Sequence, residues 1–341
     1  MKIYMHSTVF EPSVGGVETV GELLAGEWLK TGADVKISTD TPGPLVGNNS
    51  IPVIRCPRRS DVIDCVRWAD VVFHNHPATR WAWVPQLYRK PWYATVHTWL
   101  PMYHAGGGMS QKVRAMMQRR LMGDCQLIAV SEAIAAHLPR NRTRVIWNPC
   151  RFSWMGETTN RNRAIDVLFV GRLVPDKGVD LLLDALVQLA AAQCYVRTKI
   201  IGDGPLKASL REQAKQAGLA EWIQFAGTQA PDTLQDEFAA ARCTVVPSRW
   251  EEPFGLVAIE ALACGSIPVV ADSGGLPEAV GPHGLVFPRG DAKALAEILQ
   301  RIVKGEINGS FVSSGAIEAQ LAHHDPAKVA ARYLDVFSES L

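Results

Sequence analysis

The sequence has 341 residues, 47% of them apolar and 20% charged, and its formal net charge is +1. These values are ordinary for a soluble globular protein with room for two domains, and the near-neutral charge indicates no class of partner. No apolar run approaches the ~20 residues that a membrane-spanning helix needs, so the sequence predicts no such helix.

The first half of the chain alternates strand and helix signals, and its first strand leads into a glycine-rich turn. Ser131 follows a strand and is placed to cap the helix after it. We expect strands at 3–6, 34–39, 70–75, 92–97, 127–131 and 145–147, and helices at 18–31, at 110–122 and after Ser131.

A polar stretch at 151–163 is typical of a linker, and a second alternation of strands and helices follows it. We expect strands at 165–170, 197–201, 223–226, 243–246, 267–271 and 284–287, and helices that include 179–192 and 326–338.

This alternation predicts the fold class α/β, with two doubly wound parallel sheets covered by helices. Ligands bind such sheets beyond the carboxyl ends of the strands, and two facing domains would form a cleft. We place one domain at 1–155 and a second at 156–322. The remaining segment, 323–341, is expected to be a helix that packs back toward the first domain.

The strongest motif contains two glutamates eight positions apart, Glu252 and Glu260, in the run PSRWEEPFGLVAIEALACG. A buried strand ends before the run, and a helix is expected to begin inside it. The backbone N–H groups of Gly255, Leu256 and Val257 are free at such a helix start and form an anion site. A diphosphate fits there, with a carboxylate on either side to accept hydrogen bonds from sugar and ribose hydroxyls.

This segment resembles the E-x7-E region of family 4 of the retaining glycosyltransferases, which have the GT-B fold of two Rossmann-like domains. The resemblance implies that Glu252 contacts the donor sugar and that Glu260 binds the ribose diol. Phe254 belongs to the Pro-Phe-Gly-Leu-Val run that strengthens the match, and it is assigned to the donor site. Glu251 is interpreted as a loop residue because the spacing favours its neighbour. The alternative is a plain helix start with two solvated glutamates.

A second element, FVGRLVPDKGVD, carries Arg172 and Lys177 between a strand and a helix. A guanidinium and an ammonium there would neutralise the charge of a departing diphosphate. The element resembles the family's Gly-Arg-…-Lys-Gly loop, and both cations are assigned to catalysis and to donor binding. Gly15 and Gly16 similarly resemble the family's loop that closes over the donor. Surface cations and a plain glycine turn are the alternatives.

His97 ends a strand, and the resemblance implies a position near the C6 region of the donor, with a structural role as the alternative. Gly202 lies in a Gly-Asp-Gly-Pro turn that resembles a family element and would lie under the nucleotide. His74 and His76 end another strand and suggest a metal site. We reject this site because no carboxylate is close in sequence and the resembled fold works without metal. No cofactor is therefore expected.

Basic residues dominate the first half between positions 80 and 144, which indicates an anionic partner. The helix expected at 110–122 carries apolar side chains near one face, with Lys112, Arg114, Arg119 and Arg120 beside them. This pattern fits docking on an anionic membrane surface, or packing on the core. The seven cysteines are scattered, and the N-terminus enters a strand with no signal peptide. We therefore expect a cytoplasmic protein that contacts the inner face of the membrane.

The resemblance implies a retaining, metal-independent hexosyltransferase. The first domain would bind the acceptor and the second a UDP- or GDP-linked sugar. The acceptor would be a hydroxyl of a glycan, a glycolipid or a small molecule, in envelope polysaccharide or lipopolysaccharide biosynthesis. Nucleic acid is not an expected partner, and the oligomeric state stays open. A nucleotide-sugar epimerase of similar fold and a non-catalytic nucleotide-sugar-binding module are the alternatives.

Overall fold

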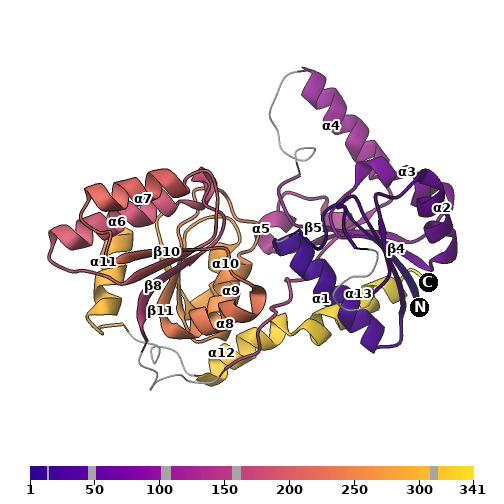
Figure 1. Ribbon diagram of the computed structural model, residues 1–341. Helices are drawn as coiled ribbons and strands as arrows, with labels where there is room; N and C mark the ends of the chain where they lie inside the picture. The colour runs from indigo at the N-terminus through magenta and orange to yellow at the C-terminus, as the bar shows by residue number, and fades with distance from the viewer. Residues whose placement is uncertain (14, 45–50, 101–108, 156–162, 308–313) are drawn as a thin grey trace. The chain divides into compact units, whose positions relative to one another are not determined.

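The computed structural model describes residues 1–13, 15–44, 51–100, 109–155, 163–307 and 314–341. The chain divides into two compact units (Figure 1). The first unit comprises Met1–Pro149 and His323–Leu341, and the second comprises Cys150–Ala322. None of the seven cysteines, all of which are described, forms a disulfide.

The first unit contains a seven-stranded sheet of order β3-β2-β1-β4-β5-β6-β7, in which all pairs are parallel. Its strands are β1 (Lys2–Ser7), β2 (Asp34–Thr39), β3 (Val53–Arg55), β4 (Val71–His74), β5 (Trp92–Val96), β6 (Gln126–Ala129) and β7 (Thr143–Val145). Its α-helices are α1 (Gly16–Lys30), α2 (Arg59–Trp68), α3 (Trp83–Leu87), α4 (Met109–Leu121), α5 (Glu132–Ala135) and α13 (Pro326–Ser338). The order of the strands reverses between β1 and β4, which brings the loops after these strands together.

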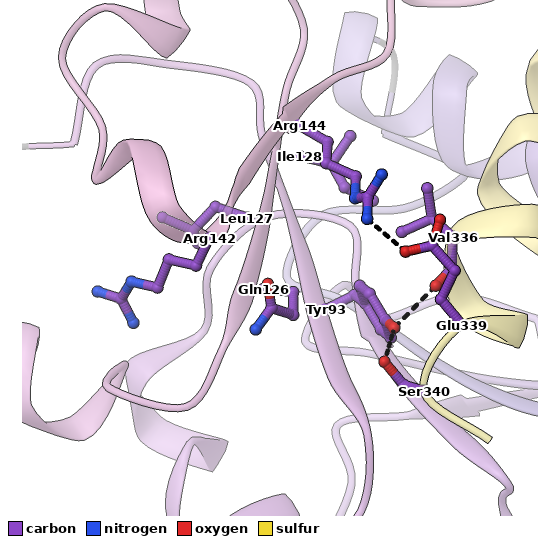
Figure 2. A pocket seen from close by; sticks show the side chains of 9 residues that line it. All are labelled: Tyr93, Gln126, Leu127, Ile128, Arg142, Arg144, Val336, Glu339 and Ser340. Carbon is purple, nitrogen blue, oxygen red and sulfur yellow. Dashed lines mark hydrogen bonds and ion pairs between the residues drawn. The ribbon is translucent and has the colours of Figure 1, made fainter.

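The C-terminal helix α13 packs on α1 and on the sheet of the first unit. The indole of Trp28 donates a hydrogen bond to the carbonyl of Ala330, 3.2 Å away. At the far end of α13, the Tyr93 hydroxyl donates to the Val336 carbonyl at 2.9 Å, as Figure 2 shows. The same figure shows the ion pair between Arg144 and Glu339. The last helix of the chain is therefore part of the first unit.

The second unit contains a six-stranded sheet of order β10-β9-β8-β11-β12-β13, again with parallel pairs. Its strands are β8 (Ile165–Val170), β9 (Thr198–Ile201), β10 (Ile223–Gly227), β11 (Ala241–Val246), β12 (Ile267–Ala271) and β13 (Leu285–Phe287). Its α-helices are α6 (Val179–Ala191), α7 (Lys207–Gln216), α8 (Pro231–Ala240), α9 (Leu256–Ala263), α10 (Leu276–Val280), α11 (Ala292–Val303) and α12 (Ser314–Leu321). The strand order reverses between β8 and β11.

Burial explains why these segments form strands and helices. The central strands β4 and β5 are buried along their whole length, and so is β12, as expected for parallel strands covered on both faces. Helix α6 buries its leucines and Val179 in the main core of the second unit. Ser131 caps α5 as predicted, since its hydroxyl accepts from the N–H of Ile134 at 3.1 Å.

Two features of the first unit differ from the expectation. The segments β3, α2 and α3 were not predicted, because they are short or weakly patterned. The strand predicted at 145–147 ends instead at Val145. Trp147 lies beyond the end of this strand, and its ring stacks on the ring of His324, with 5.4 Å between the ring centroids.

Candidate active site

The site in the second unit is built from loops at the point where the strand order reverses. Residues 171–178 follow β8, and residues 247–255 follow the adjacent strand β11. Because the strands are parallel, both loops leave the same edge of the sheet, where ligands bind in doubly wound folds. The two strongest motifs of the sequence therefore meet at one place.

Glu252 lies at the centre of the site formed by these two loops. Its side chain is 10% exposed, and its Oε1 lies 2.5 Å from the Nζ of Lys177. The hydroxyl of Ser248 donates to the same carboxylate oxygen at 2.6 Å. The carboxylate is therefore oriented by one charged and one neutral donor, from two different segments. The adjacent Glu251 is exposed and pairs with Arg289 at 3.5 Å.

Close backbone contacts hold the Glu252 loop in place. The N–H of Gly275 donates to the carbonyl of Glu252 at 2.7 Å, and the hydroxyl of Ser273 donates to the carbonyl of Trp250, also at 2.7 Å. Gly274 has a φ of +58°, and a Cβ there would lie 2.2 Å from the Glu252 carbonyl oxygen. Only glycine allows this approach. The loop after β12 thus holds the backbone of the loop that carries Glu252.

Gly178 joins the two loops in the same way. Its φ is +66°, and a Cβ there would lie 1.9 Å from the carbonyl oxygen of Pro247. The N–H groups of Arg249 and Trp250 donate to the carbonyl of Asp176, at 2.9 and 3.1 Å. Backbone hydrogen bonds therefore join the loop that carries Lys177 to the loop that carries Glu252. These bonds hold the two side chains of the ion pair close together.

Glu260 lies on α9 and is 7% exposed. Its Oε1 is 3.1 Å from the Nε of Arg151. Burial raises the pKa of Glu260 to about 7, and the guanidinium of Arg151 opposes this increase. The carboxyl group consequently takes up a proton at higher pH than a solvated glutamate does.

The remaining donor-site candidates of the second unit lie around these two glutamates. Arg172 is exposed, at the start of the loop that ends with Lys177. Gly202 has a φ of +140° and packs on Gly171, whose N–H donates to the carbonyl at the end of β9. Phe254 is only 3% exposed, so a contribution to a donor site would come from its backbone. Gly255 precedes α9 with a φ of +114°, and no described side chain caps the helix start at Leu256 and Val257.

The candidates of the first unit follow strands at or next to the reversal point of its own sheet. His97 follows β5, and Gly15 and Gly16 follow β1. Asn75 connects them, because its Oδ1 is 3.1 Å from His97 Nε2 and its Nδ2 donates to the Val17 carbonyl at 2.8 Å. Burial, assisted by the neighbouring His76, lowers the pKa of His97 to about 3.

The histidines and tryptophans of the first unit divide into buried and accessible residues. His6 and His74 are at most 1% exposed, and Trp81 and Trp92 are at most 3% exposed. These two tryptophans therefore fill the core. Trp83 is 37% exposed.

The basic surface of the first half is smaller than the charge count indicates. Arg142 donates to the carbonyls of Met122 and Gly123, and Arg144 pairs with Glu339. Four exposed cations lie on α4: Lys112, Arg114, Arg119 and Arg120.

Helix α4 also exposes four apolar side chains: Val113 at 40%, Met116 at 63%, Met117 at 59% and Leu121 at 40%. Figure 1 shows the helix extending away from the sheet of the first unit. The helix is therefore not a core helix. The side chain of Met109, the first residue of α4, is not among those that the structure describes. In the part of the chain that the structure describes, no helix has both the length and the apolar character to cross a membrane.

Three residues of these sites were not predicted from the sequence. Arg151 is 109 positions from Glu260, Ser248 is a common loop residue, and Asn75 has no motif of its own between His74 and His76. The only signal in the sequence was the position of each residue before or after a strand that ends at the site.

The fold and the motifs agree with known proteins. Over 99% of this chain and 100% of the other, the structure superimposes on HepE of Anabaena in complex with UDP, with a TM-score of 0.81 and 22% identity. Sucrose-phosphate synthase of Thermosynechococcus elongatus gives a TM-score of 0.76 at 23% identity, over 99% of this chain and 98% of that one. With its two Rossmann-like parallel-sheet domains, the chain has the GT-B fold of glycosyltransferases.

A sequence family also matches. Residues 151–312 match the model of the glycosyl transferases group 1 family. An uncharacterized glycosyltransferase of Methanocaldococcus jannaschii is 30% identical over 64% of this chain and 60% of its own length. A D-inositol 3-phosphate glycosyltransferase of Streptosporangium roseum is 28% identical over 89% of this chain and 75% of its own length. Another, from Streptomyces bingchenggensis, is 35% identical over 52% of this chain, but only 41% of that relative is matched.

Proposed function

We propose that the protein is a retaining glycosyltransferase of family 4 that uses a nucleoside diphosphate sugar as donor. The observation that carries the proposal is the ion pair of Lys177 with the buried Glu252, placed ahead of the helix that carries Glu260. This pairing joins the two strongest motifs in a group 1 family segment. The solved structures of HepE with UDP and with UDP-glucose support a nucleotide-sugar donor.

In the proposed complex, Glu260 accepts hydrogen bonds from the ribose hydroxyls, and the start of α9 binds the diphosphate through its N–H groups. Arg172 and Lys177 neutralise the charge that develops on the departing diphosphate. Glu252 accepts hydrogen bonds from the hydroxyls of the donor sugar. The ion pair with Lys177 orients this carboxylate before the donor arrives.

Retention requires the acceptor hydroxyl to attack C1 from the face that the diphosphate leaves. We propose that an oxygen of the departing phosphate takes the proton of the attacking hydroxyl. The O–C1 bond of the product forms as the C1–O bond to the diphosphate breaks. The protein then supplies positioning and charge stabilisation rather than a strong base, which agrees with the low pKa of His97. No metal takes part in this proposal, so turnover should persist after chelation with EDTA.

The first unit is the proposed acceptor-binding domain, with His97 and the loop at Gly15 and Gly16 at its site. The acceptor is a hydroxyl of a glycan, a glycolipid or a small molecule, and we place the reaction in envelope polysaccharide biosynthesis. Helix α4, with its exposed methionines and cations, is the proposed contact with the anionic inner face of the membrane.

Titration calorimetry with UDP, GDP and their common sugar conjugates tests the donor class. The proposal expects one nucleoside diphosphate to bind, and it expects Glu260→Gln to weaken this binding. A mass analysis of the products distinguishes the alternatives, because an epimerase converts the donor without an acceptor and a binding module converts nothing. Binding by neither nucleotide series would contradict the proposal.

A further inference from the structure

Asn75 has a complete set of hydrogen bonds, and this set fixes the orientation of its amide. Its Nδ2 lies 2.8 Å from the Val17 carbonyl oxygen and 3.1 Å from Ser7 Oγ. A carbonyl oxygen only accepts, so the atom beside it is the amide nitrogen. The Ser7 hydroxyl donates to the Val9 carbonyl at 2.6 Å, and it therefore accepts from Asn75. Both N–H bonds of the amide are thus used.

The other side of the amide faces His97. Asn75 Oδ1 is an acceptor, and it lies 3.1 Å from Nε2 of the imidazole. Nε2 must therefore carry a hydrogen. His97 is neutral at physiological pH, because burial lowers its pKa to about 3. A neutral imidazole has one N–H, so Nδ1 carries a lone pair. Within the residues that the structure describes, Nδ1 has no hydrogen-bond partner.

We infer that Asn75 is a positioning residue, which holds His97 in the Nε2–H tautomer and presents Nδ1 as an acceptor for a ligand hydroxyl. The same amide binds the carbonyl of Val17, next to Gly16. Asn75 therefore bonds both the imidazole and the first turn of α1 with one side chain. The assignment of the ligand as a hydroxyl of the substrate rests on the proposed function, whereas the tautomer does not.

Gly21 supports this role from α1. A Cβ at this position would lie 2.5 Å from Asn75 Nδ2. The amide cannot move away without losing its bonds to Ser7 and Val17. An alanine at position 21 would consequently displace the Asn75 side chain without changing a residue of the network. At Gly315, in α12, a Cβ would meet no described atom within 4 Å beyond its chain neighbours and the backbone of its own helix, so Gly315→Ala provides the matched control.

The test is the tautomer of His97, read without substrate. In protein labelled with 15N-histidine, long-range 15N–1H correlations distinguish protonated from unprotonated ring nitrogens, and His97→Gln assigns the resonance among the nine histidines. We expect wild-type His97 to be neutral, with hydrogen on Nε2. Asn75→Ala and Gly21→Ala should each give a detectable Nδ1–H population. Asn75→Asp, which keeps an acceptor, should retain Nε2–H, and Gly315→Ala should leave the spectrum unchanged.

Activity gives a second readout. Asn75→Ala should lower kcat by about 10²-fold, since a displaced imidazole no longer aligns the ligand. The KM for the donor, which binds the second unit, should change little. Hydrogen on Nδ1 in the wild-type protein, or an unchanged tautomer in a folded Asn75→Ala or Gly21→Ala protein, would overturn the inference. A protein without transferase activity would refute the proposed function and leave the spectroscopic test intact.

Discussion

Lys177 and Glu252 lie 75 positions apart in the sequence and form an ion pair with 2.5 Å between Nζ and Oε1. The pair is partly buried, and Ser248 completes the hydrogen bonds of the same carboxylate oxygen. A nucleoside diphosphate that binds beside this pair meets a lysine that is already held in place. The energetic cost of ordering the lysine has then been met by folding rather than by binding.

We expect Lys177→Ala to raise the Kd for the preferred nucleoside diphosphate by about tenfold to 10²-fold, the range for a lost charged hydrogen bond. Titration calorimetry measures this change. Lys304→Ala is the control, because Lys304 is exposed on the same unit beyond the end of α11. Equal Kd values for Lys177→Ala and the wild-type protein would argue against a phosphate role.

The pKa of Glu260, raised to about 7, predicts a pH dependence of nucleotide binding. An ionised carboxylate accepts hydrogen bonds from both ribose hydroxyls, whereas a protonated one has an O–H of its own. Because the ionised fraction increases with pH, affinity should rise between about pH 6 and pH 8, by up to about tenfold per pH unit below the pKa. Calorimetry at several pH values measures the profile.

Two variants isolate the carboxyl group. Glu260→Gln should remove this part of the dependence, while the ionisation of the diphosphate itself affects both proteins equally. Arg151 lowers the pKa of Glu260, so Arg151→Met should shift the rise in affinity to higher pH. Profiles of the same shape for the wild-type protein and Glu260→Gln would show that the ionisation of Glu260 has no part in binding.

The close contact at Gly178 predicts that alanine at this position lowers the stability of the protein more than alanine at a second glycine with a similar backbone angle. Gly178 and Gly218 have φ values of +66° and +71°, but only Gly178 faces the Pro247 carbonyl oxygen. Gly218→Ala should cost about 1 kcal/mol for the left-handed conformation alone. Gly178→Ala should cost about 3 kcal/mol or more, because the loops must also separate. Urea unfolding of both variants measures the difference, and similar midpoints would show that the close contact is unimportant.

The exposed apolar and cationic side chains of α4 predict that the protein binds anionic vesicles. Replacing Arg119 and Arg120 by alanine should weaken binding by about tenfold or more, at about 1 kcal/mol for each cation near the surface. Met116→Asp should also weaken it, since its side chain is 63% exposed and would enter the interface. Leu87→Asp is the control, because Leu87 is an exposed apolar residue outside α4. Cosedimentation with vesicles that contain phosphatidylglycerol measures binding, and equal losses in all variants would refute a specific contact.

Much of the fold follows from local patterns in the sequence. The predicted strands at 34–39, 165–170 and 267–271 and the predicted helix at 326–338 have the bounds that the structure shows. Buried parallel strands give continuous apolar runs, and Asp325 caps the last helix before a proline. Strand β3 was not predicted because its three residues carry too little pattern.

The candidate site followed from the sequence only in part. The motifs around Lys177 and Glu252 were found because each has a recognisable local form, and the fold brings them together. The partnership of Arg151 with Glu260 had no such form, and it depends on the path of the chain before β8. The role of Asn75 could not be predicted from the sequence for a similar reason. It depends on four hydrogen bonds, and all four are made to residues of other segments.

The most direct test of the account is the release of nucleoside diphosphate from a panel of UDP- and GDP-linked sugars with mixed acceptors, in two neighbouring variants. Glu252 is buried in the ion pair, whereas Glu251 is exposed beside it. The account predicts that Glu252→Gln lowers the rate of release by about 10²-fold or more and that Glu251→Gln leaves it within about twofold of wild type. Equal rates in the wild-type protein and Glu252→Gln, or a loss confined to Glu251→Gln, would contradict it.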